Sequence, residues 1–153
     1  KLGRDLGMAE RIRFLGSVPN DRVHELIFAS DMAVFPSLAE ATSIACLEVM
    51  ACGIPVVVSD VGGLPEIVKH EENGLIVPFG LGASTFRDPG LPDSAIVDLS
   101  RAIERLLVSP ELRRTLGAAA REDVLQHRSW SRYTEEVETI YARVLGRQQG
   151  GQA

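Results

Sequence analysis

The sequence predicts an α/β fold in which a parallel sheet is flanked by helices and followed by further C-terminal helices. Short apolar runs alternate with amphipathic helical patterns up to residue 77, which is typical of parallel βα units joined by right-handed crossovers. Beyond residue 93 the apolar spacing is helical throughout. With 45% hydrophobic and 24% charged residues among 153, the chain has the composition of one globular domain, not of a disordered protein.

Four short apolar segments are expected to form the strands. The segment that begins at Arg11 and runs to Leu15 alternates polar and apolar side chains, whereas residues 56–58 are three consecutive valines, as in a strand that is covered on both faces. A glycine or a proline directly follows three of the four segments. The expected strands are Ile12–Leu15, Met32–Phe35, Val56–Val58 and Leu75–Val77.

Helices are expected between these strands. Asn20 can cap the first helix, and either Thr42 or Ser43 can cap the second. Gly53 stands where the residue after a helix often needs a positive φ. The expected helices are one that begins near Asn20, one over Ile44–Ala51 and a short one over Leu64–Lys69.

The part of the chain after the sheet reads as a long loop and three helices. The loop, residues 78–93, is rich in glycine and proline and is either mobile or functional. The third helix carries Trp130 and Tyr133, which we interpret as packing residues on a partly exposed apolar face. We expect one domain over residues 1–145 and a flexible polar tail over residues 146–153.

Composition and charge exclude several classes of protein. The net charge of −5 argues against a dedicated nucleic-acid binder, and no apolar run approaches the roughly 18 residues of a membrane span. Two cysteines cannot form a disulfide framework, and no Cys/His cluster suggests zinc. The whole acidic excess lies in residues 1–92, so an anionic ligand there needs backbone N–H groups or cations from elsewhere.

The chain begins with Lys1 and not with Met, and its first residues read like the end of a helix that runs into a strand. We therefore expect a fragment of a longer protein, cut inside a domain. The alternative is a processed chain that is complete.

The most informative segment runs from Phe35 to Val57. A buried strand ends in a loop with one carboxylate, Glu40, and the next helix begins with hydroxyl residues and carries a second carboxylate, Glu48. Open α/β folds bind ligands at this carboxyl edge of the sheet. The free N–H groups of residues 42–45 are expected to face that edge, where the helix dipole favours a phosphate.

Glu48 has two interpretations. Its neighbours in the helix are apolar, so a buried carboxylate there would need hydrogen bonds, which a ligand diol such as a ribose can donate. Alternatively, Glu48 lies on an exposed strip of the helix and pairs with an arginine. The spacing alone favours this second interpretation.

The same segment resembles the E-x7-E signature of retaining glycosyltransferases with the two-domain GT-B architecture, known as family 4 or glycosyl transferases group 1. Glu40 and Glu48 have the required separation. Further segments resemble this family in the same order, namely residues 14–16, 31–37, 47–57, 62–68 and 73–75. The resemblance extends over about residues 5–145 and implies part of the C-terminal, Rossmann-like, nucleotide-sugar-binding domain.

The resemblance implies a role for each matched residue. Glu40, the candidate for the catalytic centre, lies beside the donor sugar and helps to orient it, and Glu48 binds the ribose hydroxyls. The residues implied to meet the sugar and the diphosphate through backbone N–H groups are Ala41, Thr42, Ser43 and Ile44, and those implied to contact the base are Gly16, Ser17 and Val18. No cofactor and no metal is implied in the site.

The implied reaction transfers a hexosyl unit from an NDP-sugar to a glycan, lipid or small-molecule acceptor, with retention at the anomeric carbon. It depends on electrostatic stabilisation of the leaving diphosphate and on alignment of the acceptor. Glu40 could be a covalent nucleophile, as in retaining glycosidases. The resemblance instead makes it a positioning residue for front-face attack.

Two departures from the family pattern bear on function. Many members have Glu-Gly-Phe-Gly where this chain has residues 40–43, although the hydroxyl groups of Thr42 and Ser43 can still donate to an anion. The arginine and lysine that bind the diphosphate, and the acceptor-binding N-terminal domain, lie upstream in the family and are not matched. We therefore expect the chain alone to be inactive and to bind nucleotide weakly. The resemblance implies a cytoplasmic location, with peripheral membrane association through the N-terminal domain as an option.

Two other classes of function remain open. A non-catalytic nucleotide or sugar-phosphate-binding module shares this fold, and a flavodoxin-like signalling domain fits the βα pattern but lacks the E-x7-E set. Nucleotide binding separates the first two classes from the third. The histidines are expected at the surface, and Cys46 and Cys52 are expected to be small packing residues.

Overall fold

The computed structural model of the chain describes residues 2–80 and 91–149 and contains a three-stranded parallel sheet. Its strands are β1 (Ala33–Phe35), β2 (Val56–Ser59) and β3 (Leu75–Val77), in the order β1-β2-β3. Both pairs of neighbouring strands are parallel. Three of the four predicted strands are therefore confirmed, with β1 and β2 each differing by one residue at one end.

The predicted strand at Ile12–Leu15 is wrong. The chain before residue 20 forms α1 (Leu2–Asp5) and a 3-10 turn, η1 (Ala9–Arg11), and then continues without regular structure. Phe14 is 93% exposed. Alternating side chains are compatible with a strand, but a strand also needs a neighbour for its backbone N–H and C=O groups. Within the described residues, β1 pairs with β2 alone and no strand lies beside residues 12–15.

The helices between the strands form where the sequence predicts them. They are α2 (Asn20–Phe28), α3 (Ile44–Ala51) and α4 (Leu64–Ile67), of which α4 is two residues shorter than predicted. Asn20 is the first residue of α2 and not its cap. Of the two candidate caps of α3, Ser43 is the one used, because its Oγ accepts a hydrogen bond from the N–H of Cys46 at 3.4 Å. Gly53 follows α3 with a φ of +76°, as predicted.

Three longer helices complete the chain, α5 (Asp93–Val108), α6 (Pro110–His127) and α7 (Trp130–Gln149). Most of the predicted loop, residues 81–90, lies outside the described residues. Helix α7 continues through Gln149, four residues into the predicted tail, and residues 150–153 again lie outside the described part.

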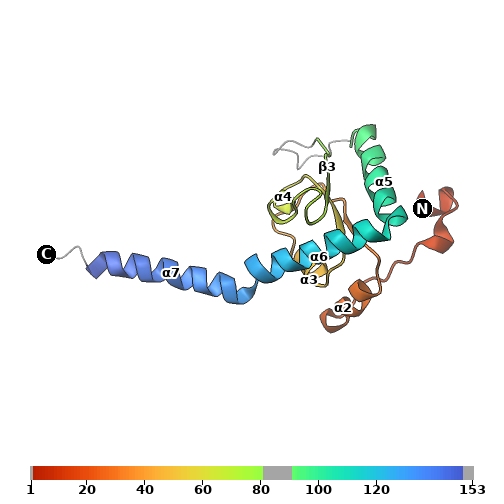
Figure 1. The fold of residues 1–153 in the computed structure, drawn as a ribbon. Helices are drawn as coiled ribbons and strands as arrows, with labels where there is room; N and C mark the ends of the chain where they lie inside the picture. The colour runs from red at the N-terminus through yellow and green to blue at the C-terminus, as the bar shows by residue number, and fades with distance from the viewer. Residues whose placement is uncertain (1, 81–90, 150–153) are drawn as a thin grey trace.

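Helices cover both faces of the sheet (Figure 1), and alternate residues of β2 contact opposite layers. Val56 and Val58 belong to the apolar cluster with α3, α4 and the second half of α6. Val57 belongs to the cluster with β3 and α5, which also contains Leu116 of α6. All four residues of β2 are buried. The layered α/β architecture is therefore the predicted one.

Helix α7 extends away from the sheet (Figure 1), and much of its apolar face is exposed. The rings of Trp130 and Tyr133 contact each other edge to face, with centroids 6.1 Å apart, while Trp130 remains 81% exposed. The two aromatic residues thus pack on each other and not in either core. Of the helices in residues 2–80 and 91–149, none combines the length and the apolar character needed to cross a membrane.

Candidate functional site

The segment that carries Glu40 joins β1 to α3 at the carboxyl end of the sheet, and we call residues 36–43 the Glu40 loop. The buried Ser59, at the end of β2, holds this loop because its Oγ donates to the carbonyl oxygen of Ser37 at 2.7 Å. The Oγ of Ser37 in turn donates a long hydrogen bond, 3.5 Å, to Oε2 of Glu40. The half-buried carboxylate is therefore oriented by residues anchored to the sheet.

Two glycines behind the Glu40 loop determine how closely the loop approaches the sheet. A Cβ atom at position 62 would lie 1.6 Å from the carbonyl oxygen of Glu40, and one at position 63 would lie 2.2 Å from that of Ala41. The N–H of Gly63 donates to the Ala41 oxygen at 3.0 Å. In the sequence, residues 62–68 match the family pattern, which by itself assigns no structural role to the two glycines. The signal that could have revealed this role is a pair of consecutive glycines in the short turn between a buried strand and a helix, where backbones approach closely.

The first turn of α3 leaves backbone donors at the surface. Ser43 is buried as the cap, whereas Ala41, Thr42 and Ile44 are exposed. The N–H of Ile44 is taken up by the carbonyl oxygen of Thr42 at 3.1 Å, so it is less available to a ligand than the sequence predicts. Within the described residues, the N–H groups of Thr42, Ser43 and Ala45 have no hydrogen-bond partner. They remain candidates for binding an anion.

Glu48 lies on the exposed side of α3, as in the second interpretation, which the spacing favours, and not buried as in the first. The apolar residues around it in sequence face the core, and position 48 falls between them on the outer side of the helix. Its carboxylate has no hydrogen bond or ion pair to any described residue, so the arginine pair of the alternative interpretation is not formed either. Glu48 is a solvated carboxylate, and its binding of ribose stays a prediction.

The hollow that the predicted base-contacting residues Ser17 and Val18 line contains no described residue of the Glu40 loop. Ser17 and Val18 line a hollow of about 230 Å³ beside α2, with Arg22 and Leu26 on its other side. Gly16, with a φ of +65°, begins this turn. A second hollow, of about 220 Å³, lies between the Glu40 loop, α4 and the start of α7, and we call it the α4 hollow. Its lining includes Thr42, Gly63, Glu66, Arg128 and Tyr133, none of which lines the first hollow.

The cysteine next to the Glu40 loop is not a nucleophile. Burial, and then the negative charge of Glu40, raise the pKa of Cys46 to about 12, although the positive charge of Arg128 opposes the shift. Its Sγ contacts Sδ of Met50 at 3.8 Å in the core. Cys46 is therefore a packing residue, as predicted. No group of three or more His, Cys, Asp or Glu side chains among residues 2–80 and 91–149 is arranged to hold a metal ion.

Comparison with known proteins identifies the family. The sequence model of the family described as "Glycosyl transferases group 1" matches residues 1–87. An uncharacterized glycosyltransferase of Methanocaldococcus jannaschii is 37% identical over 136 residues, which are 89% of this chain and 31% of that protein. The chain thus spans about a third of the length of such relatives.

Solved structures agree with this assignment. Sucrose-phosphate synthase from Thermosynechococcus elongatus superimposes with a TM-score of 0.79 at 30% identity, over 95% of this chain and 33% of that one. HepE of Anabaena, in complex with UDP and glucose, superimposes with a TM-score of 0.73 at 25% identity, over 92% of this chain and 34% of that one. The fold is the Rossmann-like fold of GT-B glycosyltransferases, and the chain belongs to the glycosyl transferases group 1 family.

Proposed function

We propose that this chain is the nucleotide-sugar-binding part of a retaining glycosyltransferase, which transfers a hexosyl unit from an NDP-sugar to a glycan, lipid or small-molecule acceptor. The observation that carries the proposal is the Glu40 loop. It places an oriented carboxylate beside the free N–H groups of a capped helix, at the carboxyl end of a parallel sheet. Membership of the family, and a structural relative in complex with UDP and glucose, support the proposal.

The diphosphate of the donor binds at the first turn of α3 in this proposal. The N–H groups of Thr42, Ser43 and Ala45 and the dipole of the helix favour negative charge there, while the exposure of Ala41 and Thr42 leaves the site accessible. The ribose hydroxyl groups donate to Glu48. Because Glu48 is already solvated, the ligand exchanges water for hydrogen bonds and does not relieve a buried charge.

Glu40 orients the donor sugar in this proposal and does not attack it. Its Oε2 is held by Ser37 and the loop behind it is fixed against Gly62 and Gly63, an arrangement that suits a group whose position must not change. As the glycosidic bond breaks, negative charge grows on the leaving diphosphate, and the donors at the start of α3 stabilise it. The acceptor then attacks from the same face that the leaving group occupies.

The rest of the reaction needs groups from outside this chain. Residues 1–92 carry a net acidic excess. The Glu40 loop offers the diphosphate backbone N–H donors and hydroxyl groups, but residues 36–43 include no positively charged side chain. We propose that an upstream domain of the parent chain supplies both the cations and the acceptor site. The isolated chain then binds nucleotide weakly and does not turn over the donor.

Titration of the 15N-labelled chain with UDP, GDP and ADP tests the proposal. We expect one nucleotide to shift the amide resonances of residues 41–45 in a saturable manner, whereas the amides of α5, on the other face of the sheet, stay unchanged. Absence of shifts with all three nucleotides, or shifts confined to the hollow beside α2, would overturn it.

A further inference from the structure

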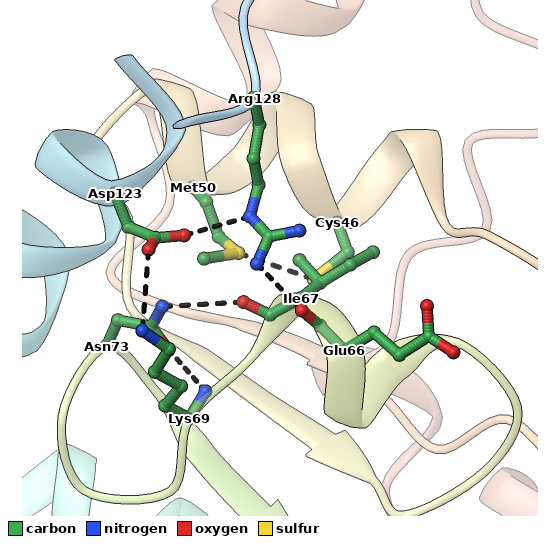
Figure 2. Close-up of polar contacts among 8 residues, drawn as sticks. All are labelled: Cys46, Met50, Glu66, Ile67, Lys69, Asn73, Asp123 and Arg128. Carbon is green, nitrogen blue, oxygen red and sulfur yellow. Dashed lines mark hydrogen bonds and ion pairs between the residues drawn. The ribbon is translucent and has the colours of Figure 1, made fainter. Parts of the chain in front are cut away.

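Arg128 lies where α6 gives way to α7, and its side chain bonds to two other parts of the fold (Figure 2). Its Nε donates to Oδ2 of Asp123 at 2.9 Å, and its Nη2 donates to the carbonyl oxygen of Glu66 in α4 at 2.7 Å. The backbone N–H of Arg128 donates to Val124 at 2.9 Å. Backbone and side chain together thus fix the guanidinium group at the end of α6.

Asp123 is the less exposed partner of this pair. Its side chain is 12% exposed and that of Arg128 is 25% exposed, so their attraction is screened less than that of a surface pair. The other carboxylate oxygen, Oδ1, lies 4.0 Å from Nζ of Lys69, just beyond α4. Asn73 closes the same segment by accepting from the N–H of Lys69 at 2.7 Å and donating to the Ile67 oxygen at 3.4 Å.

Helix α4 has four residues, too few to hold its position by its own hydrogen bonds. Arg128 donates to the carbonyl oxygen of Glu66 within α4, and at Gly63, the residue just before α4, the N–H donates to the carbonyl oxygen of Ala41 in the Glu40 loop. The same helix therefore touches Arg128 at one end and the Glu40 loop at the other. Thr42, Gly63, Glu66 and Arg128 also line the α4 hollow together, which shows that these groups are close in space.

We propose that Arg128, oriented by Asp123, is a positioning residue for the donor site. By holding α4 against the Ala41 carbonyl group, it fixes the conformation of the Glu40 loop and of the backbone donors that follow it. This inference rests on the proposed function, because it assigns a consequence for nucleotide binding. In this proposal Arg128 acts on the donor site through α4.

The test compares Arg128 with Arg121 of α6. Arg121 also donates a side-chain hydrogen bond to a backbone carbonyl group of another helix, that of Ala51 at the end of α3, but it does not line the α4 hollow. Arg121→Gln is therefore the matched control for Arg128→Gln. Arg128→Lys keeps the positive charge, but its ammonium group lacks the planar guanidinium geometry that lets arginine donate to Asp123 and to Glu66 at the same time. Circular dichroism shows whether each variant is folded.

The first readout is hydrogen exchange of the Gly63 amide, measured by NMR without ligand. We expect exchange about tenfold faster in Arg128→Gln, the scale of losing one charge-assisted hydrogen bond. The Arg128→Lys variant is expected to fall between wild type and Arg128→Gln, and Arg121→Gln to match wild type. Unchanged exchange in Arg128→Gln, or equal acceleration in both glutamine variants, overturns the inference.

The second readout is the affinity for whichever of UDP, GDP and ADP binds the wild type most tightly. We expect Arg128→Gln to bind it about fivefold more weakly, and Arg121→Gln to bind it as wild type does. Faster Gly63 exchange with unchanged affinity overturns the role in donor binding. If the wild type binds none of the three nucleotides, the proposed function fails, and the exchange experiment still decides whether Arg128 holds α4.

Discussion

Gly62 lies so close to Glu40 that a Cβ atom at position 62 would stand 1.6 Å from the carbonyl oxygen of Glu40. The glycine also has a φ of +58°, a conformation that side chains disfavour. The loop that carries the proposed donor-orienting carboxylate therefore rests on a position where only glycine fits. A substitution at Gly62, in the turn after β2, would therefore act on the site by displacing the backbone of the Glu40 loop.

Replacement of Gly62 by alanine is expected to displace the Glu40 loop. The clash and the backbone strain together should lower the free energy of unfolding by about 2–4 kcal/mol. NMR should show shifted amide resonances for residues 40–42. Gly80→Ala is the control, since Gly80 has a φ of +65° but, among residues 2–80 and 91–149, no atom within 4 Å of the added Cβ. If both variants lose the same stability, strain alone explains the effect and the contact with Glu40 is unimportant.

Replacement of Glu48 by alanine is expected to weaken nucleotide binding by about 1.5–3 kcal/mol, the scale of a hydrogen bond to a charged group. Because Glu48 is exposed and has no partner among the described residues, the free energy of unfolding should change by less than about 0.5 kcal/mol. Isothermal titration and urea denaturation measure the two quantities. Glu104→Ala, an exposed glutamate on α5, is the control. An affinity unchanged by Glu48→Ala removes Glu48 from the proposed site.

Replacement of Gly117 by alanine is expected to separate α3 from α6. Its Cβ atom would lie 2.1 Å from the carbonyl oxygen of Gly53, so we expect a loss of about 1–3 kcal/mol of stability with nucleotide affinity preserved. Gly146, also within a helix, has no atom of the described part of the chain within 4 Å of an added Cβ. Gly146→Ala should stabilise by up to about 1 kcal/mol through helix propensity. Thermal denaturation should show a lower melting temperature for Gly117→Ala and a higher one for Gly146→Ala. A Gly117→Ala variant that is more stable than wild type would contradict the close packing of Gly117 on Gly53.

The ion pair of Arg105 and Glu71 predicts a pH dependence. The hydrogen bond from Arg105 at 2.7 Å, then the charges of Arg105 and His70, lower the pKa of Glu71 from its usual 4.5. A carboxyl group with a lowered pKa in the folded state stabilises the fold above its unfolded pKa, and this contribution is lost as the pH falls. Arg105→Gln should therefore be less stable than wild type at about pH 7, and the difference in stability should be smaller at about pH 3. Urea denaturation at both pH values is the measurement, and a difference as large in acid as at neutral pH would contradict the prediction.

The elements that depend on local signals could be predicted from the sequence. Helix α3 begins and ends where predicted, because a serine cap and a following glycine mark its boundaries. The strand of valines is buried on both faces, as its composition indicates. The segment Ile12–Leu15 was also predicted as a strand from its side-chain pattern, but it has no neighbouring strand within the described residues. Its conformation depends on a partner, which local sequence does not reveal.

In the candidate site, too, the features set by local sequence were predictable, whereas those that depend on tertiary contacts were not. The position of Glu40 at the end of β1 followed from the order of strand, loop and helix, whereas the sequence left open whether Glu48 is buried or exposed. Apolar neighbours show that a helix has a buried side but do not show that position 48 is on it. The contact of Arg128 with Glu66 joins residues 62 positions apart. It has no sequence pattern, and only the tertiary structure reveals it.

The alternation within β2 limits how the chain length can vary. Val57 packs in one helical layer, whereas Val56 and Val58 pack in the other. Insertion or deletion of one residue in this strand would therefore turn the side chains beyond that point toward the wrong layer. The same slip would move Ser59 away from Ser37 and release the Glu40 loop. Insertions and deletions that the protein tolerates should therefore fall in the connections outside residues 56–59.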